Sequence, residues 1–330
     1  RGEHVLNVPA GRMSAFEAVP GDFVDWLRAQ PEGAGLDDAA RAALFAPRRA
    51  YGRYLHARLQ AHPARDALAV HADAVVDLMP EQDGYRAVFA SGAHLHARAV
   101  VLATGNQPAP LPVPAPTAGT IEAWDYAAVA AIPAEASVCI VGAGLSMVDV
   151  VLTLHANGHR GPIRALSRHG LMPLAHAPGT RPQPGDIAAM LPLGVRARMR
   201  LLRQWVAQAR AEGRPWQDAH ERLRPHVRTL WQAWPEVERR RFLRHAVRLW
   251  DIHRHRIAPH VAAVVEGMRD TGRVLLEAGR VSTIVPTAQG VRIDWTPRRG
   301  APRSWQADVV VNATGMEKRL SRAPGALLPA

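Results

Sequence analysis

The stretch ASVCIVGAGLSMVDVVLTLHANGHRGPIRALSRHG, Ala136 to Gly170, decides the fold. Val138 to Val141 is a continuous apolar run of the kind found in buried strands. Apolar residues then recur at helical spacing over 145–154, and Gly158 is a typical helix end. A second short apolar run at 163–166 predicts another strand. Strand, glycine turn, helix and strand in this order predict the beginning of a βαβ unit of the dinucleotide-binding type.

The glycine turn of this unit is the first candidate binding site. Gly142 permits a tight turn, and Gly144 has no side chain that would keep a pyrophosphate from the backbone amides of the helix start. Those amides and the helix dipole present about half a positive charge. We therefore expect Gly142, Gly144, Leu145 and Ser146 to bind a dinucleotide, although Met147 replaces the usual third glycine. A tight turn that binds nothing is the alternative.

The end of the second strand bears on which nicotinamide cofactor is used. An NAD site generally carries Asp or Glu there, whereas this chain has Ser167, Arg168 and His169. A guanidinium pairs with a 2′-phosphate, which a carboxylate would repel. We therefore predict that Ser167 and Arg168 contact the cofactor and that NADP is preferred, with NAD possible. Arg168 as a solvated loop residue is the alternative.

One strand ending occurs twice in the chain. VVLATGNQPAP at 100–110 has a near twin in VVVNATGMEK at 309–318. Each follows a short apolar strand, a glycine that opens a second strand (Gly84 or Gly290), and a third run that finishes in Ala-Thr-Gly. We expect two similar β-meanders that each lead into a buried strand, and hence two related nucleotide-binding halves.

Composition limits the class of protein. The chain has 330 residues, of which 48% are hydrophobic, enough for two domains with cores. No apolar run reaches the roughly 18 residues of a membrane helix and no leader-like segment opens the chain, so a cytoplasmic protein without a membrane partner is expected. Cys139 is the single cysteine, which excludes a redox dithiol and a thiolate zinc site. No metal is predicted.

The formal net charge of +12 raises the question of a nucleic-acid partner. Lys318 is the only lysine, so the basic charge is arginine in a chain rich in Ala and Pro. This pattern is as typical of compositional bias as of a nucleic-acid surface, and nucleic acid is disfavoured as a partner. The arginine excess favours anionic ligands such as nucleotide phosphates.

Helical patterning replaces the strands from 186 to 270, which predicts a helical insertion. Within it, HRHR at 253–256 leaves two interpretations open. It is a basic surface helix, or one of its arginines or histidines contacts an anionic substrate or a cofactor phosphate. A metal site is disfavoured, because alternate histidines on a helix face different directions.

Further motifs carry a family resemblance. HVLNVPAGRMSAF at 4–16, APRRAYGRYL at 46–55 and WDIHRHRIAP at 250–259 accompany the glycine turn and the two Ala-Thr-Gly endings. With them the chain resembles the FAD/NAD(P)-binding oxidoreductase family, two-dinucleotide-binding-domain flavoproteins related to flavin-dependent N-hydroxylating monooxygenases. The resemblance implies an α/β fold with two Rossmann-like domains, one for FAD and one for NAD(P), together with β-meanders and the helical insertion.

The resemblance also implies a division of the chain. We expect an FAD-binding domain at 1–110, a linker at 111–136, an NAD(P)-binding domain at 137–315 that contains the insertion, and a return segment to the FAD domain at 316–330. The glycine turn that opens such FAD domains is absent from this sequence. We therefore expect a fragment that lacks both ends of the family's chain.

The resemblance implies FAD and NADP as cofactors and places further residues beside them. These are Asn7, Arg12, Met13, Ser14, Val75, Ala103, Thr104, Gly105, Ala313, Thr314 and Gly315. No catalytic side chain is assigned, because flavin performs the chemistry while the protein positions donor and acceptor.

The expected activity passes hydride from NADPH to flavin and on to oxygen or an unidentified acceptor, with a small molecule as substrate or electron acceptor. A flavin-dependent hydroxylase of a small substrate is one alternative. Against it, Ala123 stands where such enzymes carry the histidine of a phenylalanine-glycine-histidine signature. A non-catalytic nucleotide- or nucleic-acid-binding protein is the other alternative. The oligomeric state is not predicted.

Overall fold

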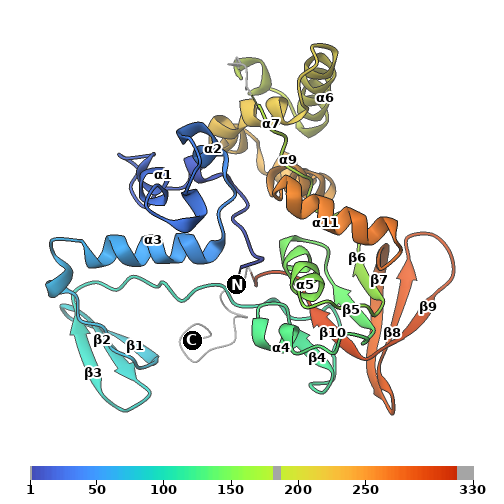
Figure 1. Cartoon of the computed structure of the whole chain (residues 1–330), viewed down its shortest axis with the longest axis horizontal. Coiled ribbons are helices and arrows are strands. Elements are labelled where there is room, and N and C mark those ends of the chain that lie inside the picture. Colours follow the sequence, from blue (N-terminus) through green and yellow to red (C-terminus); the bar gives the residue numbers. More distant parts are fainter. Residues whose placement is uncertain (1, 181–186, 318–330) are drawn as a thin grey trace.

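A computed structural model of the chain describes residues 2–180 and 187–317. Figure 1 shows a large sheet on one side of the molecule, a small sheet on the other, and groups of helices above both. The predicted α/β class is confirmed by this arrangement. The predicted start of the insertion at 186 and most of the predicted return segment, 318–330, lie outside the described residues.

The large sheet has seven strands in the order β4-β10-β5-β6-β7-β8-β9. The pairs from β4 to β7 are parallel, and the last two pairs are antiparallel. Its strands are β4 (Thr120–Glu122), β5 (Val138–Val141), β6 (Ile163–Ser167), β7 (Val274–Thr287), β8 (Gly290–Pro297), β9 (Arg303–Ala307) and β10 (Val309–Asn312). All four residues of β5 are buried, as the apolar run predicts. β4 comes from the stretch predicted as a linker.

Two different layers cover the two faces of this sheet. On one face, α4 (Tyr126–Ala130), α5 (Leu145–Ala156) and α11 (Pro259–Asp270) form a core with the parallel strands. On the other, Cys139 and Val141 pack with apolar residues of β7 and β8, including Trp295. Burial raises the pKa of the Cys139 thiol to about 12, which keeps it inert.

The two predicted meanders are confirmed. The small sheet consists of β1 (Val75–Glu81), β2 (Gly84–Phe89) and β3 (His94–Ala97), joined antiparallel like β7, β8 and β9. Both have a bulge near the start of the first hairpin, between 75 and 77 and between 281 and 283.

Equivalent glycines open the second strand of each meander. Gly84 and Gly290 both have positive φ, and a Cβ on either would lie 2.4 Å from a carbonyl oxygen, that of Ala97 or Ala307. Only glycine fits such a close approach.

The strand expected at 100–105 is wrong. The twin segment at 309–312 is β10, which pairs with β4 on one side and β5 on the other. Residues 98–107 form no strand, and Val101 is 88% exposed. The physical reason is that a strand needs neighbours for its backbone groups. No described strand pairs with this segment, and only its last residue, Gln107, accepts a backbone hydrogen bond, from the Glu317 amide at 2.9 Å. Farther on, the Ala109 amide donates to the Gly315 carbonyl at 2.9 Å, so the chain just after the first motif meets the second.

The N-terminal residues form a small helical unit. Its helices are α1 (Asp22–Leu27), α2 (Asp38–Ala43) and α3 (Arg48–Gln60), with short 3-10 turns η1 (Ala10–Arg12), η2 (Pro31–Gly33) and η3 (Arg65–Ala67). Asp37 begins α2 by accepting a hydrogen bond from the Ala40 amide at 2.7 Å. Phe23, Leu27 and Tyr54 form the core of the unit.

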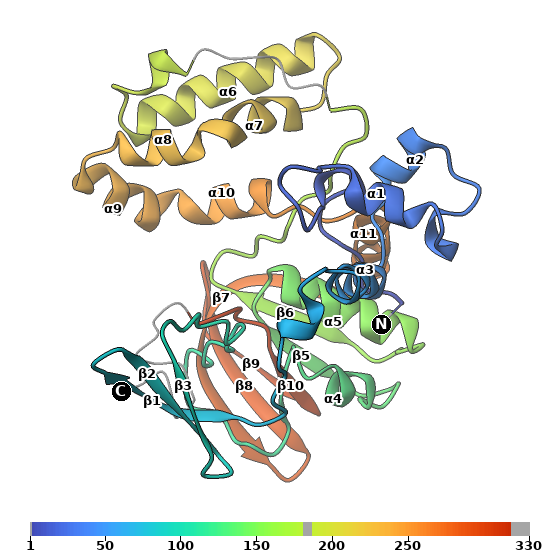
Figure 2. The ribbon, with the colours of Figure 1, turned by 90° about the vertical axis from the view of Figure 1, so that its left-hand side faces the viewer.

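Helices fill the described part of the predicted insertion, but α11, at the end of the predicted range 186–270, packs on the large sheet instead. Figure 1 shows the other helices on the far side of α11 from that sheet, and Figure 2 shows them at the top of the molecule. The elements of this insertion are η4 (Ala188–Met190), α6 (Val195–Ala211), α7 (Gln217–Leu223), η5 (Arg224–His226), α8 (Val227–Gln232), α9 (Glu236–His245) and α10 (Val247–Arg254). The buried Arg198 guanidinium holds its centre together by donating to the carbonyls of Met190, Leu191 and Leu230. Among the described residues, no helix is long and apolar enough to span a membrane.

Candidate functional site

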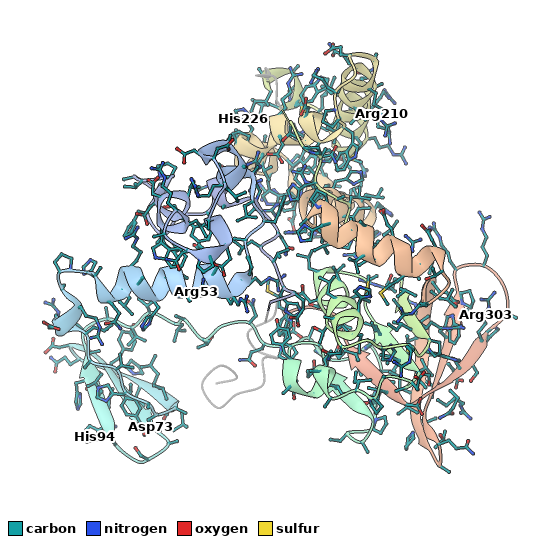
Figure 3. All side chains as sticks on the ribbon, viewed as in Figure 1. Arg53, Asp73, His94, Arg210, His226 and Arg303 are labelled. Atoms are coloured by element: carbon teal, nitrogen blue, oxygen red, sulfur yellow. The ribbon has the colours of Figure 1, made fainter. Side chains whose placement is uncertain are left out.

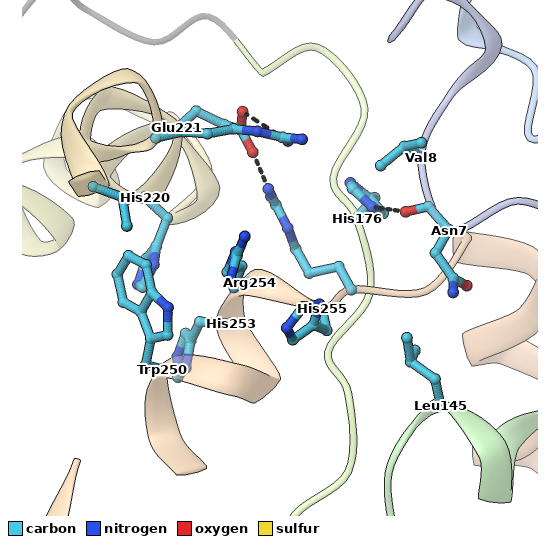
Figure 4. Close-up of a pocket in the computed structure, with 13 residues that line it drawn as sticks. Asn7, Val8, Leu145, His176, His220, Glu221, Trp250, His253, Arg254 and His255 are labelled. Carbon is cyan, nitrogen blue, oxygen red and sulfur yellow. Dashed lines mark hydrogen bonds and ion pairs between the residues drawn. The ribbon is translucent and has the colours of Figure 1, made fainter. Parts of the chain in front are cut away.

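A cavity of about 270 Å³ lies where three parts of the chain meet. Asn7 comes from the N-terminal segment, Leu145 from the start of α5, and Glu221 and Trp250 from the insertion (Figure 4). We call this cavity the cleft. Figure 4 shows the side chains of Asn7 and Leu145 directed toward the same space. The predicted FAD-side and NAD(P)-side segments are thus brought together at one site.

An ion cluster stands at the insertion side of the cleft. Arg256 and Arg12 both contact the Glu221 carboxylate, the latter with 2.8 Å between Nη1 and Oε2, and Arg224 approaches it to 3.7 Å. The side chains of Glu221 and Arg256 are only 6% and 4% exposed. Burial alone would raise the pKa of Glu221, but the charges of Arg256 and Arg12 hold it below its ordinary value. Through Arg12 the cluster connects the N-terminal segment to the insertion.

Aromatic rings form another wall of the cleft. The rings of His220 and His253 stack with centroids 4.9 Å apart, and His220 also lies 5.8 Å from the ring of Trp250. Burial, together with the charges of His253 and Arg256, lowers the pKa of His220 to about 3. This histidine is therefore neutral at pH 7.

His176 fixes the N-terminal segment from below the insertion. Burial lowers its pKa to about 4, so its ring is neutral and Nε2 donates to the Asn7 carbonyl at 2.8 Å (Figure 4). The carbonyl of Asn7 is thereby occupied, and its side-chain amide remains for the cleft.

The glycine turn lies beside the cleft and has two different glycines. Gly142 has a φ of +122°, and an added Cβ would lie 2.1 Å from the Ala313 carbonyl oxygen, so close packing against the second Ala-Thr-Gly requires glycine here. At Gly144, an added Cβ would meet no heavy atom within 4 Å. Gly144 precedes α5 without any side-chain cap for the first amides of the helix. This open, uncapped helix start fits a diphosphate group.

Two side chains support the turn. Arg248 was not predicted from the sequence, and Ser146 was predicted to bind the cofactor. Arg248 of α10 donates through Nη2 to the carbonyls of Ala143 at 3.2 Å and Leu171 at 2.9 Å. Burial lowers the pKa of Arg248. Ser146 accepts a hydrogen bond from Trp124 Nε1 at 3.2 Å. No local signal distinguishes Arg248 from the many other arginines of the insertion.

A second, open cavity of about 420 Å³ lies by the end of β6. It is lined by Ala278, Pro297, Arg298 and Arg299. A Cβ on Gly170, three residues after the end of β6, would lie 3.0 Å from Ala278. Burial lowers the pKa of nearby His169, and the charges of Arg168, Arg298 and Arg248 lower it further. Arg298 and the predicted Arg168 therefore form a basic patch. In the sequence, the pair of arginines between β8 and β9 could have indicated Arg298.

The remaining predicted residues lie in three different places. Thr314 Oγ1 lies 2.9 Å from the Ala109 carbonyl oxygen, which places Ala313 to Gly315 at the junction of the two repeats and beside the glycine turn. Met13 packs against the N-terminal core, and Ser14 Oγ contacts the Val19 carbonyl at 2.7 Å. Val75 and the exposed Ala103 to Gly105 line neither cavity. The assignment of all these residues to cofactors stays a prediction.

An ion pair anchors the APRRAYGRYL motif to α5. Arg48 donates from Nη1 and Nη2 to the two carboxylate oxygens of Asp149, at 2.7 and 3.0 Å. His4 Nε2 lies 2.9 Å from Thr153 Oγ1 one turn farther along the same helix. The N-terminal segment therefore sits directly on the helix that begins at the glycine turn.

Comparison with known proteins identifies the architecture. Residues 1–107 match the family model described as FAD-NAD(P)-binding. A search of curated proteins gives no match. Reduced ornithine hydroxylase from Pseudomonas aeruginosa is 18% identical, with 96% of this chain and 71% of that chain covered and a TM-score of 0.58.

Two further solved structures are similar. Ornithine N-hydroxylase from Kutzneria sp. 744, with reduced FAD, NADP⁺ and L-ornithine, is 15% identical, with 96% of this chain and 70% of that chain covered and a TM-score of 0.58. The FAD-bound cadaverine monooxygenase from Erwinia amylovora is 12% identical, covers 96% and 68%, and has a TM-score of 0.57. The expected fold is confirmed, and the family model confirms FAD and NAD(P) as the cofactor class. The chain therefore has the fold of two-dinucleotide-binding-domain flavoproteins, and its first 107 residues match the FAD-NAD(P)-binding family model.

Proposed function

We infer that the protein is an FAD-dependent oxidoreductase that takes hydride from NADPH and passes electrons to oxygen or another small acceptor. One observation carries this inference: Asn7 of the family-matched segment and Leu145 of the glycine-turn helix line the same cleft. Bound flavin would supply the acceptance and onward transfer of the electrons. The protein's own residues supply positioning, charge and the exclusion of water.

The dinucleotide would be held at two places. The uncapped amides at the start of α5 would donate hydrogen bonds to the diphosphate, and Gly144 leaves the space that it needs. Arg168 and Arg298 supply the positive charge that a 2′-phosphate requires, and this supports NADPH over NADH.

The insertion closes the site from above. Arg12 and Glu221 join it to the N-terminal segment, while Arg248 joins it to the glycine turn. His176, His220 and Trp250 give the cleft neutral walls beside its charged residues Glu221 and Arg256.

Anaerobic reduction tests the proposal. The purified protein, supplied with FAD, should bind the flavin and lose its yellow absorption when NADPH is added without oxygen. Admission of air should restore the colour. A protein that holds FAD but is not bleached by NADPH or NADH would contradict the proposal.

A flavin-dependent hydroxylase of a small substrate is the second candidate. The specific support is the fold shared with hydroxylating enzymes and a cleft covered by the helical insertion. Oxygen consumption that matches hydroxylated product would favour this candidate, whereas oxygen consumption that ends only in hydrogen peroxide would favour a simple oxidoreductase.

A further inference from the structure

We propose that the cleft binds a small, flat organic molecule by its oxyanion group, a carboxylate in the first instance, and that Arg256 is the residue that binds it. This inference rests on the proposed function, because it names the class of molecule that occupies the same site.

The guanidinium of Arg256 has donors without acceptors. One amino group contacts Glu221, but Nε and Nη1 are buried and have no hydrogen-bond partner among the described residues. The side chain lines the cleft and is 4% exposed. Buried donors are nearly always paired. Nε and Nη1 lie on different edges of the guanidinium, so an oxyanion bound in the cleft would accept a single charge-assisted hydrogen bond from one of them.

The charge of the cleft has the sign that an anion needs. Glu221 is the only acidic residue among those described as lining it, and Arg12, Arg224 and Arg256 all contact that carboxylate. His176 and His220 are neutral and cancel none of this charge. The excess is positive. An amine group would find no free carboxylate on these walls, so the cleft favours an acid over a diamine.

Beyond Arg256, one wall of the cleft is flat and aromatic and the opposite wall has apolar side chains, while Arg224, Arg254 and His255 also line the cleft. The stacked rings of His220 and His253 adjoin Trp250, as Figure 4 shows, and Leu145 and Val8 lie across from them. Such walls fit the body of an aromatic or short aliphatic acid. Because Leu145 also starts the dinucleotide helix, a phosphate of NADPH is the other source of the same oxyanion chemistry.

Calorimetry with simple probes tests the ligand class. The FAD-loaded oxidised protein is titrated with benzoate, with neutral benzamide and with cationic benzylamine. Benzoate should bind at least roughly tenfold more tightly than benzamide, and benzylamine should not bind measurably. Equal binding of benzoate and benzamide, or tighter binding of benzylamine, would overturn the proposal.

Variants test the residue. Arg256→Gln should weaken benzoate binding roughly tenfold or more, and Arg256→Lys should restore part of it. Arg210→Gln is the matched control: Arg210 is exposed at the end of α6 (Figure 3) and does not line the cleft, so benzoate binding should not change. Thermal melting establishes that each variant is folded.

Glu221→Gln keeps the test decisive if Arg256→Gln does not fold. This change removes the competing carboxylate, so benzoate binding should be retained or strengthened. If Glu221 and Arg256 served only to hold the fold, binding would fall instead, and the proposal would fail.

Further outcomes distinguish a carboxylate ligand from a phosphate of NADPH, and this inference from the proposed oxidoreductase. If Arg256→Gln weakens NADPH binding and leaves benzoate unchanged, the oxyanion belongs to the dinucleotide and the carboxylate proposal is overturned. Bleaching by NADPH without benzoate binding would sink this inference alone. Benzoate binding without bleaching would sink the proposed oxidoreductase alone.

Discussion

Asp149 is the residue through which the N-terminal segment reaches the helix of the glycine turn. Its carboxylate receives two hydrogen bonds from Arg48, and its side chain is 11% exposed. Removal of one member of such a pair leaves the other charge poorly solvated and without a partner. The loss of either residue should therefore destabilise the junction by more than the intact pair stabilises it.

The first prediction concerns this pair. Arg48→Met should lower the free energy of unfolding by about 1–3 kcal/mol, less than for a fully buried pair because the Arg48 side chain is one-third exposed. The neighbouring, exposed Arg49→Met should change it by less than about 0.5 kcal/mol. Denaturant unfolding measures both, and equal effects would remove the role given to Asp149.

The second prediction concerns cofactor choice at Arg168. Arg168→Gln should raise the KM for NADPH about tenfold or more and leave the KM for NADH nearly unchanged, because only NADPH carries the 2′-phosphate. Arg298→Gln should act in the same direction. A parallel loss for both cofactors would point to a structural role instead.

At the scale of elements, the glycine turn and α5 were predictable, whereas one strand was not. The apolar run of β5, the helical spacing of α5 and its end near Gly158 are local properties of the sequence. A strand depends on its neighbours, and this is why the same apolar pattern forms β10 at 309–312 yet no strand at 100–105. The Ala-Thr-Gly repeat therefore did not by itself predict a shared conformation.

The third prediction separates the two glycines of the turn. Gly142→Ala should cost about 2–4 kcal/mol of stability, because its φ is +122° and its Cβ would lie 2.1 Å from the Ala313 carbonyl oxygen. Gly144→Ala has open space and a φ of −93°, so stability should change by less than about 1 kcal/mol. NADPH affinity should nevertheless fall, since the methyl group would occupy the place of the diphosphate. Thermal melting and NADPH titration of both variants check this.

The insertion connects segments that are separate motifs in the sequence, the N-terminal segment and the glycine turn. Sequence reasoning found the helical nature of the insertion and the possible anion contact at 253–256. It could not find the partners, because Glu221 and Arg256 are 35 residues apart and Arg12 and Glu221 are 209 apart. Long-range pairs of this kind leave no periodic signal in a single sequence.

The fourth prediction is a loss of stability in acid. Burial lowers the pKa of His176 to about 4 and that of His220 to about 3, from 6.5. The unfolded chain therefore takes up protons on both below about pH 6.5 while the folded protein does not, so stability is complete above that pH and falls as pH drops toward 4. Each histidine should lower stability by about 2 kcal/mol at pH 5.

Unfolding measured between pH 7 and 5 checks this prediction. The double variant His176→Asn, His220→Asn should show a flatter dependence on pH than the natural chain. An equally steep dependence in the double variant would assign the effect to other groups.

The position of Arg248 has a consequence for how the two ligands act on each other. α10 is a single rod about 12 Å long, with Arg248 at its start on the glycine turn and Trp250, His253 and Arg254 farther along in the cleft. A displacement of this rod by a molecule in the cleft must also change the support of the turn. Thermodynamic reciprocity then requires that a bound acid changes the affinity for NADPH by the same factor by which bound NADPH changes the affinity for the acid. If saturation with the acid left the affinity for NADPH unchanged, α10 would not couple the two ligands.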